Sequence, residues 1–185
     1  MITLETPRLL LRQFHIDDAE DMFDLNNDPD VIRYTGDKAF ANITEATTLL
    51  RNYDQYEKYK SGRLTVILKD TQEIMGWCGL KYHPIENETD IGYRFKKKFW
   101  NKGYATESAM ASLHYGFETL QLPSIVGHAM TDNKASIRVF EKLGMNFEKE
   151  DICMEQPSVF YRITKAQWHQ KNRIYHDNQR NSQTA

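Results

Sequence analysis

The chain has little cysteine and no long apolar run, and both absences restrict what it can be. Its 185 residues include two cysteines, Cys78 and Cys153, which are too few for a disulfide framework and lack the spacing of a metal site. No stretch is apolar enough to span a membrane, and the first residues lack the basic start and apolar core of a signal peptide. We therefore expect a cytoplasmic protein that holds no metal and whose cysteines pack in its interior.

An excess of charge of either sign is also missing. The 24 Lys and Arg against 26 Asp and Glu give a net charge of -2, which argues against a general binder of nucleic acid or of anionic membranes. The length and the 40% hydrophobic content suit one domain with a sizeable core. We assign a single domain to residues 1–170, and we expect the polar residues 171–185 to form a disordered tail.

Apolar periodicity and turn residues predict alternating strands and helices without an internal repeat. Strands are expected over 8–14, 64–68, 74–80, 91–95, 124–130, 146–153 and 157–163. Helices are expected over 17–26, 44–62, 104–119 and 133–143, with one more from about residue 164. This order indicates an α+β (mixed α/β) fold in which helices cover the faces of a mixed sheet.

The segment around Gly103 is the first candidate for chemistry. An apolar strand, 91–95, leads through a lysine-rich turn, 96–102, into an amphipathic helix. Backbone N–H groups at a helix start, beside a glycine that lets a ligand approach closely, can bind an anion such as a pyrophosphate. An ordinary tight strand-to-helix connection explains this segment equally well when it is taken alone.

The second candidate is the start of the helix expected over 133–143. Asp132 or Asn133 can cap this helix, and Gly144 is well placed to end it in a left-handed conformation. Asn133 and Ser136 are three residues apart, so their side chains lie near one another on the helix. A capped surface helix without a ligand is the competing interpretation.

Taken together, these segments resemble the GNAT family, the Gcn5-related N-acetyltransferases, and within it the RimJ/RimL-like branch. Three pieces carry the resemblance, and with their intervening elements they cover about residues 2–165. They are Glu5-Thr-Pro-Arg-Leu-Leu-Leu-Arg12, then Ile91-Gly-Tyr with Trp100-Asn-Lys-Gly-Tyr-Ala-Thr-Glu107, and Asn133-x-x-Ser136 with Phe140-Glu-Lys-Leu-Gly-Met145. The resemblance implies a mostly antiparallel sheet with a V-shaped split between two parallel strands, 90–96 and 124–130.

The resemblance also implies an acetyl-CoA site in that split. The backbone of Tyr93, Arg94 and Phe95 would pair with the pantetheine arm, and Asn133 would contact the cosubstrate. N–H groups would hold the pyrophosphate at Asn101, Lys102, Gly103, Tyr104, Ala105 and Thr106.

Two positions depart from the family pattern and direct attention to the catalytic groups. Phe140 stands where many relatives have a tyrosine that protonates the leaving thiolate, so Ser136, expected near the sulfur, is the substitute acid. Asp90 stands where many relatives have glutamate, and we expect it to act through water as general base.

The acceptor is expected to be a primary amine that attacks acetyl-CoA directly in a ternary complex. At pH 7 a lysine amine needs roughly 4.6 kcal/mol to become neutral, whereas an α-amine needs only about 1–1.4 kcal/mol. With one carboxylate, Asp90, as the expected base, the sequence favours a peptide or protein N-terminus or another small amine of low pKa. Residues that could line the acceptor pocket are Tyr34, Trp77, Tyr82 and His83. In the competing interpretation Trp77 and Tyr82 pack on the sheet and His83 is an exposed loop residue, although a histidine could also serve as base.

Two other functions are compatible with parts of the same sequence. A non-catalytic acetyl-CoA-binding sensor or regulatory module would need the same cosubstrate site, and turnover with a panel of amines separates it from an enzyme. A nucleotide-binding α/β domain is weakly supported, because the chain contains neither GxGxxG nor a Walker sequence. The sequence does not decide whether the protein is a homodimer.

Overall fold

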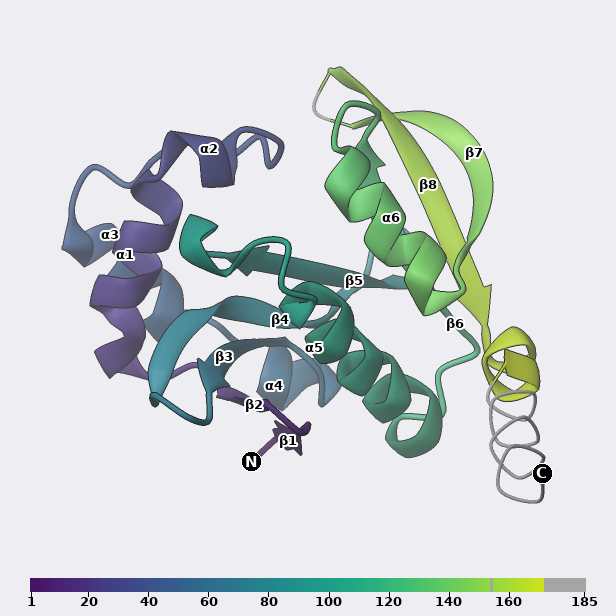
Figure 1. The fold of residues 1–185 in the computed structure, drawn as a ribbon, viewed down its shortest axis with the longest axis horizontal. Helices are drawn as coiled ribbons and strands as arrows, with labels where there is room; N and C mark the ends of the chain where they lie inside the picture. Colours follow the sequence, from purple (N-terminus) through teal and green to yellow (C-terminus); the bar gives the residue numbers. More distant parts are fainter. Residues whose placement is uncertain (154, 172–185) are drawn as a thin grey trace.

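Eight strands form one sheet in the computed structural model, which describes residues 1–153 and 155–171 (Figure 1). The spatial order is β1-β2-β3-β4-β5-β6-β8-β7, and every neighbouring pair is antiparallel except β5 and β6, which are parallel. The bounds are β1 Thr3–Glu5, β2 Leu9–Gln13, β3 Arg63–Leu68, β4 Glu73–His83, β5 Glu88–Phe95, β6 Ser124–Met130, β7 Asn146–Cys153 and β8 Gln156–Thr164. The expected mixed, mostly antiparallel sheet is confirmed.

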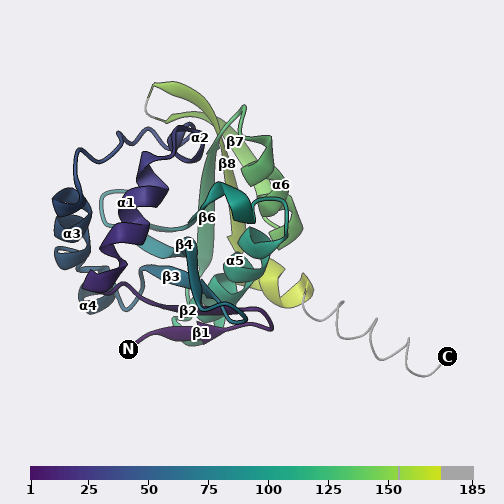
Figure 2. The same cartoon turned by 60° about the vertical axis from the view of Figure 1, so that its left-hand side comes forward.

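Helices cover both faces of the sheet (Figure 2). One face carries α5, Tyr104–His114, and α6, Lys134–Leu143. The other face carries shorter helices from the first third of the chain, which are α1 Ala19–Asn27, α2 Pro29–Ile32, α3 Ile43–Arg51 and α4 Gln55–Tyr59. A ligand that reaches through the sheet would therefore meet different helices on its two sides.

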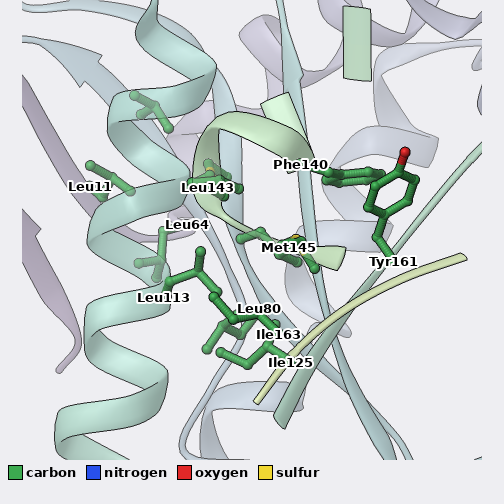
Figure 3. Close-up of a cluster of buried hydrophobic side chains, with 14 of the residues drawn as sticks. Leu11, Leu64, Leu80, Leu113, Ile125, Phe140, Leu143, Met145, Tyr161 and Ile163 are labelled. Atoms are coloured by element: carbon green, nitrogen blue, oxygen red, sulfur yellow. The ribbon is translucent and has the colours of Figure 1, made fainter. Parts of the chain in front are cut away.

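The main hydrophobic core lies between the sheet and the pair α5 and α6 (Figure 3). Leu113 from α5, Leu143 from α6 and Ile125 from β6 are fully buried there. A smaller cluster under α1 and α3 includes Leu25 and Ala46, with Trp77 packed against it. Burying an apolar side chain of this size contributes roughly 1.5–3 kcal/mol, so both clusters fix the helices onto the sheet.

The element bounds differ from the sequence predictions where local packing overrides the pattern. The stretch 44–62 forms two helices, α3 and α4, instead of one. The helix 104–119 is α-helical only to His114 and continues as a π-helical turn over Tyr115–Thr119. Strand β1 was not predicted, because its three residues are too few for an alternating pattern to be recognised. Cys78 is buried as expected, while Cys153 is only half-buried.

Two further predictions concern the ends of the described chain. Residues 165–171 are helical, as expected after residue 164. The predicted tail, 171–185, lies outside the described residues from 172 onward. Within the part of the chain that is described, no helix is long and apolar enough to cross a membrane.

Candidate active site

The parallel strands β5 and β6 part almost as soon as they meet. In the described chain, the ladder between them contains one residue pair, Asp90 with Val126. Beyond Asp90, the β5 backbone from Tyr93 to Phe95 therefore faces β6 without strand pairing. Unpaired backbone N–H and C=O groups seek hydrogen-bond partners. This edge can accept an extended ligand as if it were another strand, at the position where the sequence predicted a split.

The turn after β5 exposes N–H groups at the start of α5. Asn101 and Gly103 both have left-handed backbones, with φ of 59° and 82°. Gly103 is the N-cap of α5 and provides no side-chain hydrogen bond to the helix. The first helical hydrogen bond of α5 joins Glu107 N to Gly103 O and is 3.0 Å long. The N–H groups from Tyr104 to Thr106 come before this bond, so the helix itself provides no acceptor for them. Such a helix start attracts an anion through its free donors and its dipole.

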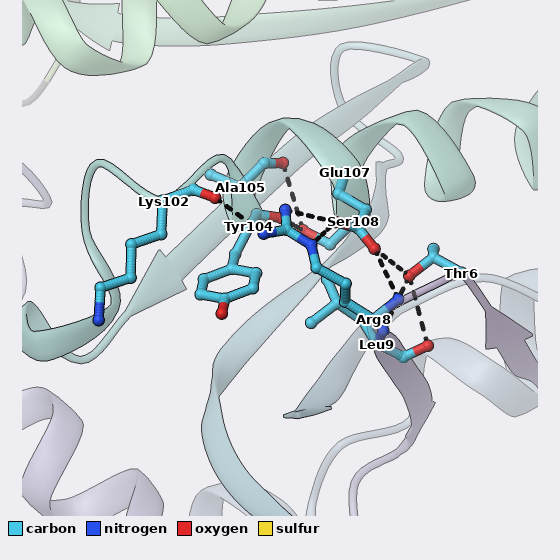
Figure 4. A network of polar contacts seen from close by, with 8 residues as sticks. All are labelled: Thr6, Arg8, Leu9, Lys102, Tyr104, Ala105, Glu107 and Ser108. Atoms are coloured by element: carbon cyan, nitrogen blue, oxygen red, sulfur yellow. Dashed lines mark hydrogen bonds and ion pairs between the residues drawn. The ribbon is translucent and has the colours of Figure 1, made fainter. Parts of the chain in front are cut away.

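A polar network attaches the start of the chain to this helix (Figure 4). Glu107 accepts hydrogen bonds from Thr6 Oγ1 at 2.6 Å and from Arg8 Nε at 2.6 Å. Arg8 also donates to the carbonyl oxygen of Lys102 at 3.1 Å and lies over the ring of Tyr104, 4.3 Å from its centroid. Two of the three sequence pieces that carry the family resemblance therefore contact each other through Arg8 and Glu107.

The lysines of the turn mostly have structural partners. Lys96 pairs with Asp21 of α1, Lys97 with Asp30 of α2, and Lys98 with Glu73 of β4. Lys102 forms no ion pair within the described residues and is exposed, so it is the lysine most available to an anion at α5. The basic run thus anchors the end of β5 to its neighbours more than it builds a phosphate site.

The start of α6 lies across from β5. Asn133 is its N-cap, and its Oδ1 accepts from the backbone N of Ser136 at 3.1 Å. Tyr93 Oη donates to the carbonyl oxygen of Ser136 at 3.2 Å. Burial raises the pKa of the Tyr93 phenol well above its ordinary value, so it remains protonated. The structure therefore brings Tyr93, Asn133 and Ser136 together on the α5 and α6 side of the opening.

Phe140 is a packing residue in this arrangement. It is 2% exposed and meets the edge of the Tyr93 ring, with 6.3 Å between centroids. On its other side it covers Gly127 of β6, where an added Cβ would lie 2.8 Å from its ring. The aromatic ring fills the space between α6 and β6 that a larger residue at 127 would need.

Asp90 has its side chain in an ion pair on the opposite face of the sheet. Arg63 Nη2 donates to both carboxylate oxygens, at 2.9 and 2.7 Å, and His83 Nε2 lies 3.0 Å from Oδ1. Burial alone would raise the pKa of Asp90, but the charge of Arg63 and the bonds from His83 and Arg63 lower it to about 2. A carboxylate this acidic binds protons weakly at neutral pH.

Arg63 was not singled out from the sequence, although one signal for it exists. Its guanidinium lies across Gly92, where an added Cβ would come within 2.6 Å of Cζ. Nη1 donates to the carbonyl oxygens of Gly79 at 2.5 Å and of Asp90 at 3.1 Å. A glycine in Ile91-Gly-Tyr93 thus leaves space for the charged side chain that covers it. This signal can be interpreted only when the pairing of β3, β4 and β5 is known.

The candidate pocket residues divide between this face and simple packing. Two guanidinium groups lie over the Trp77 ring, with 5.5 Å from Arg63 Cζ and 5.2 Å from Arg94 Cζ to the ring centroid. Arg94 also binds Asn26 of α1 and Asp37 in the connection that follows α2. Tyr82 packs on Tyr59 with 4.8 Å between centroids, which agrees with the packing interpretation.

Chemically, the two faces offer different functions. The α5 and α6 side presents free N–H groups and an unpaired strand edge, which suit an extended ligand with an anionic end. The opposite side presents a polar row along β5, with Asp90 and Arg94 beside Trp77. A ligand bound on the α5 and α6 side can reach the polar side chains of the opposite face only where β5 and β6 separate.

Comparisons with known proteins agree with this geometry. Residues 8–146 match the sequence profile described as an acetyltransferase (GNAT) domain. The uncharacterized N-acetyltransferase p20 of Bacillus licheniformis is 30% identical over 157 residues, covering 84% of this chain and 87% of that protein. A GNAT-family acetyltransferase structure from Bacillus anthracis superimposes with a TM-score of 0.78 at 27% identity, over 89% of this chain and 99% of that one.

A second solved structure shows the same fold with ligands bound. It is spermidine N-acetyltransferase from Vibrio cholerae in complex with CoA and spermine, with a TM-score of 0.76. The identity is 18%, and the alignment covers 88% of this chain and 99% of that one.

Proposed function

The chain belongs to the GNAT family of acetyltransferases, and from this premise we propose that it transfers an acetyl group from acetyl-CoA to a primary amine. The observation that carries the proposal is the opening beyond the Asp90–Val126 pair, which leads directly to the uncapped start of α5. An unpaired strand edge and an anion site in series suit the pantetheine arm and the pyrophosphate of one molecule. We also propose that the chain belongs to the RimJ/RimL-like branch of the family, because the segment from Trp100 to Glu107 resembles that branch.

The residues predicted for the cosubstrate fall on this path. The backbone of Tyr93, Arg94 and Phe95 is proposed to pair with the pantetheine arm. The N–H groups from Asn101 to Thr106 are proposed to hold the pyrophosphate, with Lys102 beside them. Because Asn133 Oδ1 already accepts the capping bond, the amide NH₂ of Asn133 is the group that we propose donates to the cosubstrate.

The reaction requires a neutral amine to attack the thioester carbon while the carbonyl oxygen gains negative charge. A backbone N–H of the unpaired β5 edge is the type of donor that can stabilise that charge, as in other oxyanion sites. The C–S bond then breaks and CoA leaves as a thiolate, which Ser136 is proposed to protonate. A thiol pKa of about 8.5 makes this leaving group a good one, so the acid contributes modestly.

The acceptor is proposed to be a peptide or protein N-terminus or a small-molecule amine. The face that carries Trp77, Asp90 and Arg94 is proposed to receive it, because it lies across the sheet from the cosubstrate. Acceptors that suit this proposal have an amine of low pKa, since the deprotonation cost is then only about 1–1.4 kcal/mol at pH 7. The spermidine acetyltransferase of the same fold makes polyamines a second group to test.

The deciding experiment measures CoA release with a thiol reagent while purified protein and acetyl-CoA are mixed with an amine panel. The panel contains peptides with free N-termini, lysine peptides with blocked N-termini, and polyamines. We expect release that depends on one of these amines, with the acetylated product identified by mass. Binding of acetyl-CoA without turnover across the panel would replace the proposal with a non-catalytic acetyl-CoA-binding module.

A further inference from the structure

A histidine–aspartate pair lies where β5 and β6 separate. His83, the last residue of β4, places Nε2 3.0 Å from Oδ1 of Asp90. Asp90 is itself the residue that pairs with Val126 at the junction. In the antiparallel register His83 is opposite Glu88, two residues from Asp90 on the same strand face. The pair is therefore held by the sheet itself and not by a loop.

Arg63 fixes the carboxylate of this pair in place. It donates to both Asp90 oxygens and to the Asp90 carbonyl, and its own side chain is 12% exposed. Asp90 therefore stays negatively charged, and its carboxylate is suited to accept a hydrogen bond from the Nε2–H group of His83. A hydrogen bond at one imidazole nitrogen fixes the tautomer and leaves the other nitrogen, Nδ1, as the proton acceptor. Within the described residues, Nδ1 of His83 forms no hydrogen bond.

The direction of the proposed cosubstrate brings its reactive end to this pair. The pyrophosphate would lie at the start of α5, which follows the C-terminal end of β5. The pantetheine arm would then extend back along β5, and its thioester would approach the junction at Asp90. The His83 side chain is 37% exposed on the face that the acceptor would reach, so an amine or a bridging water has access to it.

We infer that His83 is the general base that takes the proton of the acceptor ammonium, and that Asp90 and Arg63 are its positioning residues; the inference rests on the proposed acetyltransferase function. The ammonium gives one proton to Nδ1 of His83, and the neutral nitrogen forms a bond to the thioester carbon. The C–S bond breaks, the nitrogen loses a second proton as the amide forms, and the thiolate gains one proton. His83 then releases its proton to solvent.

Several charged groups lie around the His83–Asp90 pair and enter the pH dependence of His83. Asp90 bonds to His83, Arg63 of β3 bonds to Asp90, and His128 of β6 interacts electrostatically with both members of the pair. Glu88 of β5 and Asp151 of β7 act on His128, and Arg162 of β8 pairs with Glu88. His128 is the competing base, because it lies across the junction. Its ring packs on Phe160 with 4.4 Å between centroids, and no carboxylate hydrogen bond orients it in the described chain. Burial lowers the pKa of His128, which favours its neutral form.

The test compares kcat/KM against pH for the wild type, His83→Gln and Asp90→Asn with the best amine of the panel. We expect His83→Gln to lose roughly 100-fold in kcat/KM and to lose the acidic limb of the profile. In Asp90→Asn the limb should move to lower pH, because the imidazolium loses its negative partner; a merely structural role would leave the limb in place. Imidazole added to His83→Ala should restore part of the rate.

Two controls separate this inference from folding and from the proposed function. The rise in melting temperature caused by CoA should be the same in His83→Gln as in the wild type. His128→Gln should keep both rate and limb. An active wild type with an unchanged His83→Gln variant, or with the limb lost in His128→Gln instead, overturns the role of His83 alone. A wild type that is inert with every amine overturns the proposed function and this role with it.

Discussion

At the scale of single residues, charge pairs under the sheet decide the chemistry of the site. Arg63 connects β3, β4 and β5 through bonds to Gly79 and Asp90, and it keeps Asp90 ionised. Arg12 and Asp18 form a second such pair at the start of α1, and Asp18 has a 3% exposed side chain. The sequence indicated Asp90 but neither arginine, because the partners lie 27 and 6 residues apart along the chain and follow no periodic pattern.

The first prediction concerns acid stability through Asp90. Its pKa of about 2 lies below the ordinary 3.8, which corresponds to roughly 2 kcal/mol of stability. Because the folded pKa is the lower one, this contribution is present above about pH 4 and is lost as the pH falls toward 2. Urea unfolding of the wild type and of Asp90→Asn should differ most at pH 7 and converge toward pH 2. A constant difference across this range would contradict the assignment.

The second prediction concerns the buried pair of Asp18. Its oxygens accept from Arg12 at 2.8 and 2.6 Å, from His15 N at 2.9 Å and from Thr65 Oγ1 at 2.6 Å. Asp18→Ala leaves Arg12 without its partner, and we expect a loss of roughly 3–5 kcal/mol in unfolding free energy. The neighbouring Asp17, 83% exposed, provides the matched control, since Asp17→Ala should change stability little. Equal effects of the two variants in chemical denaturation would refute this account.

At the scale of elements, the start of α5 depends on residues from the other end of the sheet. Arg8 follows β1 in the chain, yet it supports the turn before α5 through Lys102, Tyr104 and Glu107. The N-terminal strands thus take part in shaping an anion site about a hundred residues later, which is consistent with their place in the family resemblance.

The third prediction follows from this support. Arg8→Ala removes the bond to the Lys102 carbonyl and the stacking on Tyr104, so the turn loses its fixed shape. We expect the Kd for CoA in isothermal titration calorimetry to rise about tenfold, which is ~1.4 kcal/mol. Arg51→Ala, an exposed arginine at the end of α3, should leave the Kd unchanged. An Arg8→Ala variant with wild-type affinity would show that the network only serves stability.

Elements were predictable where one local pattern dominates. Strand 124–130 and the cap at Asn133 agree with the structure because a short apolar run and cap chemistry act over a few residues. The helix after Gly103 was predicted with a regular end, yet its last turn is π-helical. There Gly116 packs against Leu80 and Ile125, with 2.7 Å from an added Cβ to either side chain. Such a close approach depends on tertiary contacts that no periodicity contains. The cosubstrate residues could be named only because short motifs of a family recur in the sequence.

At the scale of the whole molecule, the sheet consists of two antiparallel parts, β1 to β5 and β6 to β8, joined by one parallel ladder pair. The apolar core beneath α5 and α6 spans both parts and keeps them together. The opening is therefore a feature of the fold and does not depend on a bound ligand.

The fourth prediction concerns the whole molecule. A cosubstrate paired to β5 and held at α5 binds only the folded chain, so it adds about 2.7 kcal/mol of stability at a concentration 100 times its Kd. For a domain of this size that corresponds to a rise in melting temperature of roughly 5–11 °C. Differential scanning fluorimetry with CoA should show this rise, and adenosine at equal concentration should show far less. The same rise with adenosine would contradict binding through the arm and the pyrophosphate.

The contact of Arg63 with Gly92 has a consequence for how this site can diverge. A Cβ at position 92 has no room while the guanidinium covers it. A larger residue at position 92 should therefore require a smaller residue at position 63. We expect Gly92→Ala to be tolerated only together with a shorter side chain at 63. The shorter residue would leave Asp90 without its cation. In a double-mutant cycle the two substitutions should show strong coupling, because Gly92→Ala alone must displace the guanidinium from Asp90.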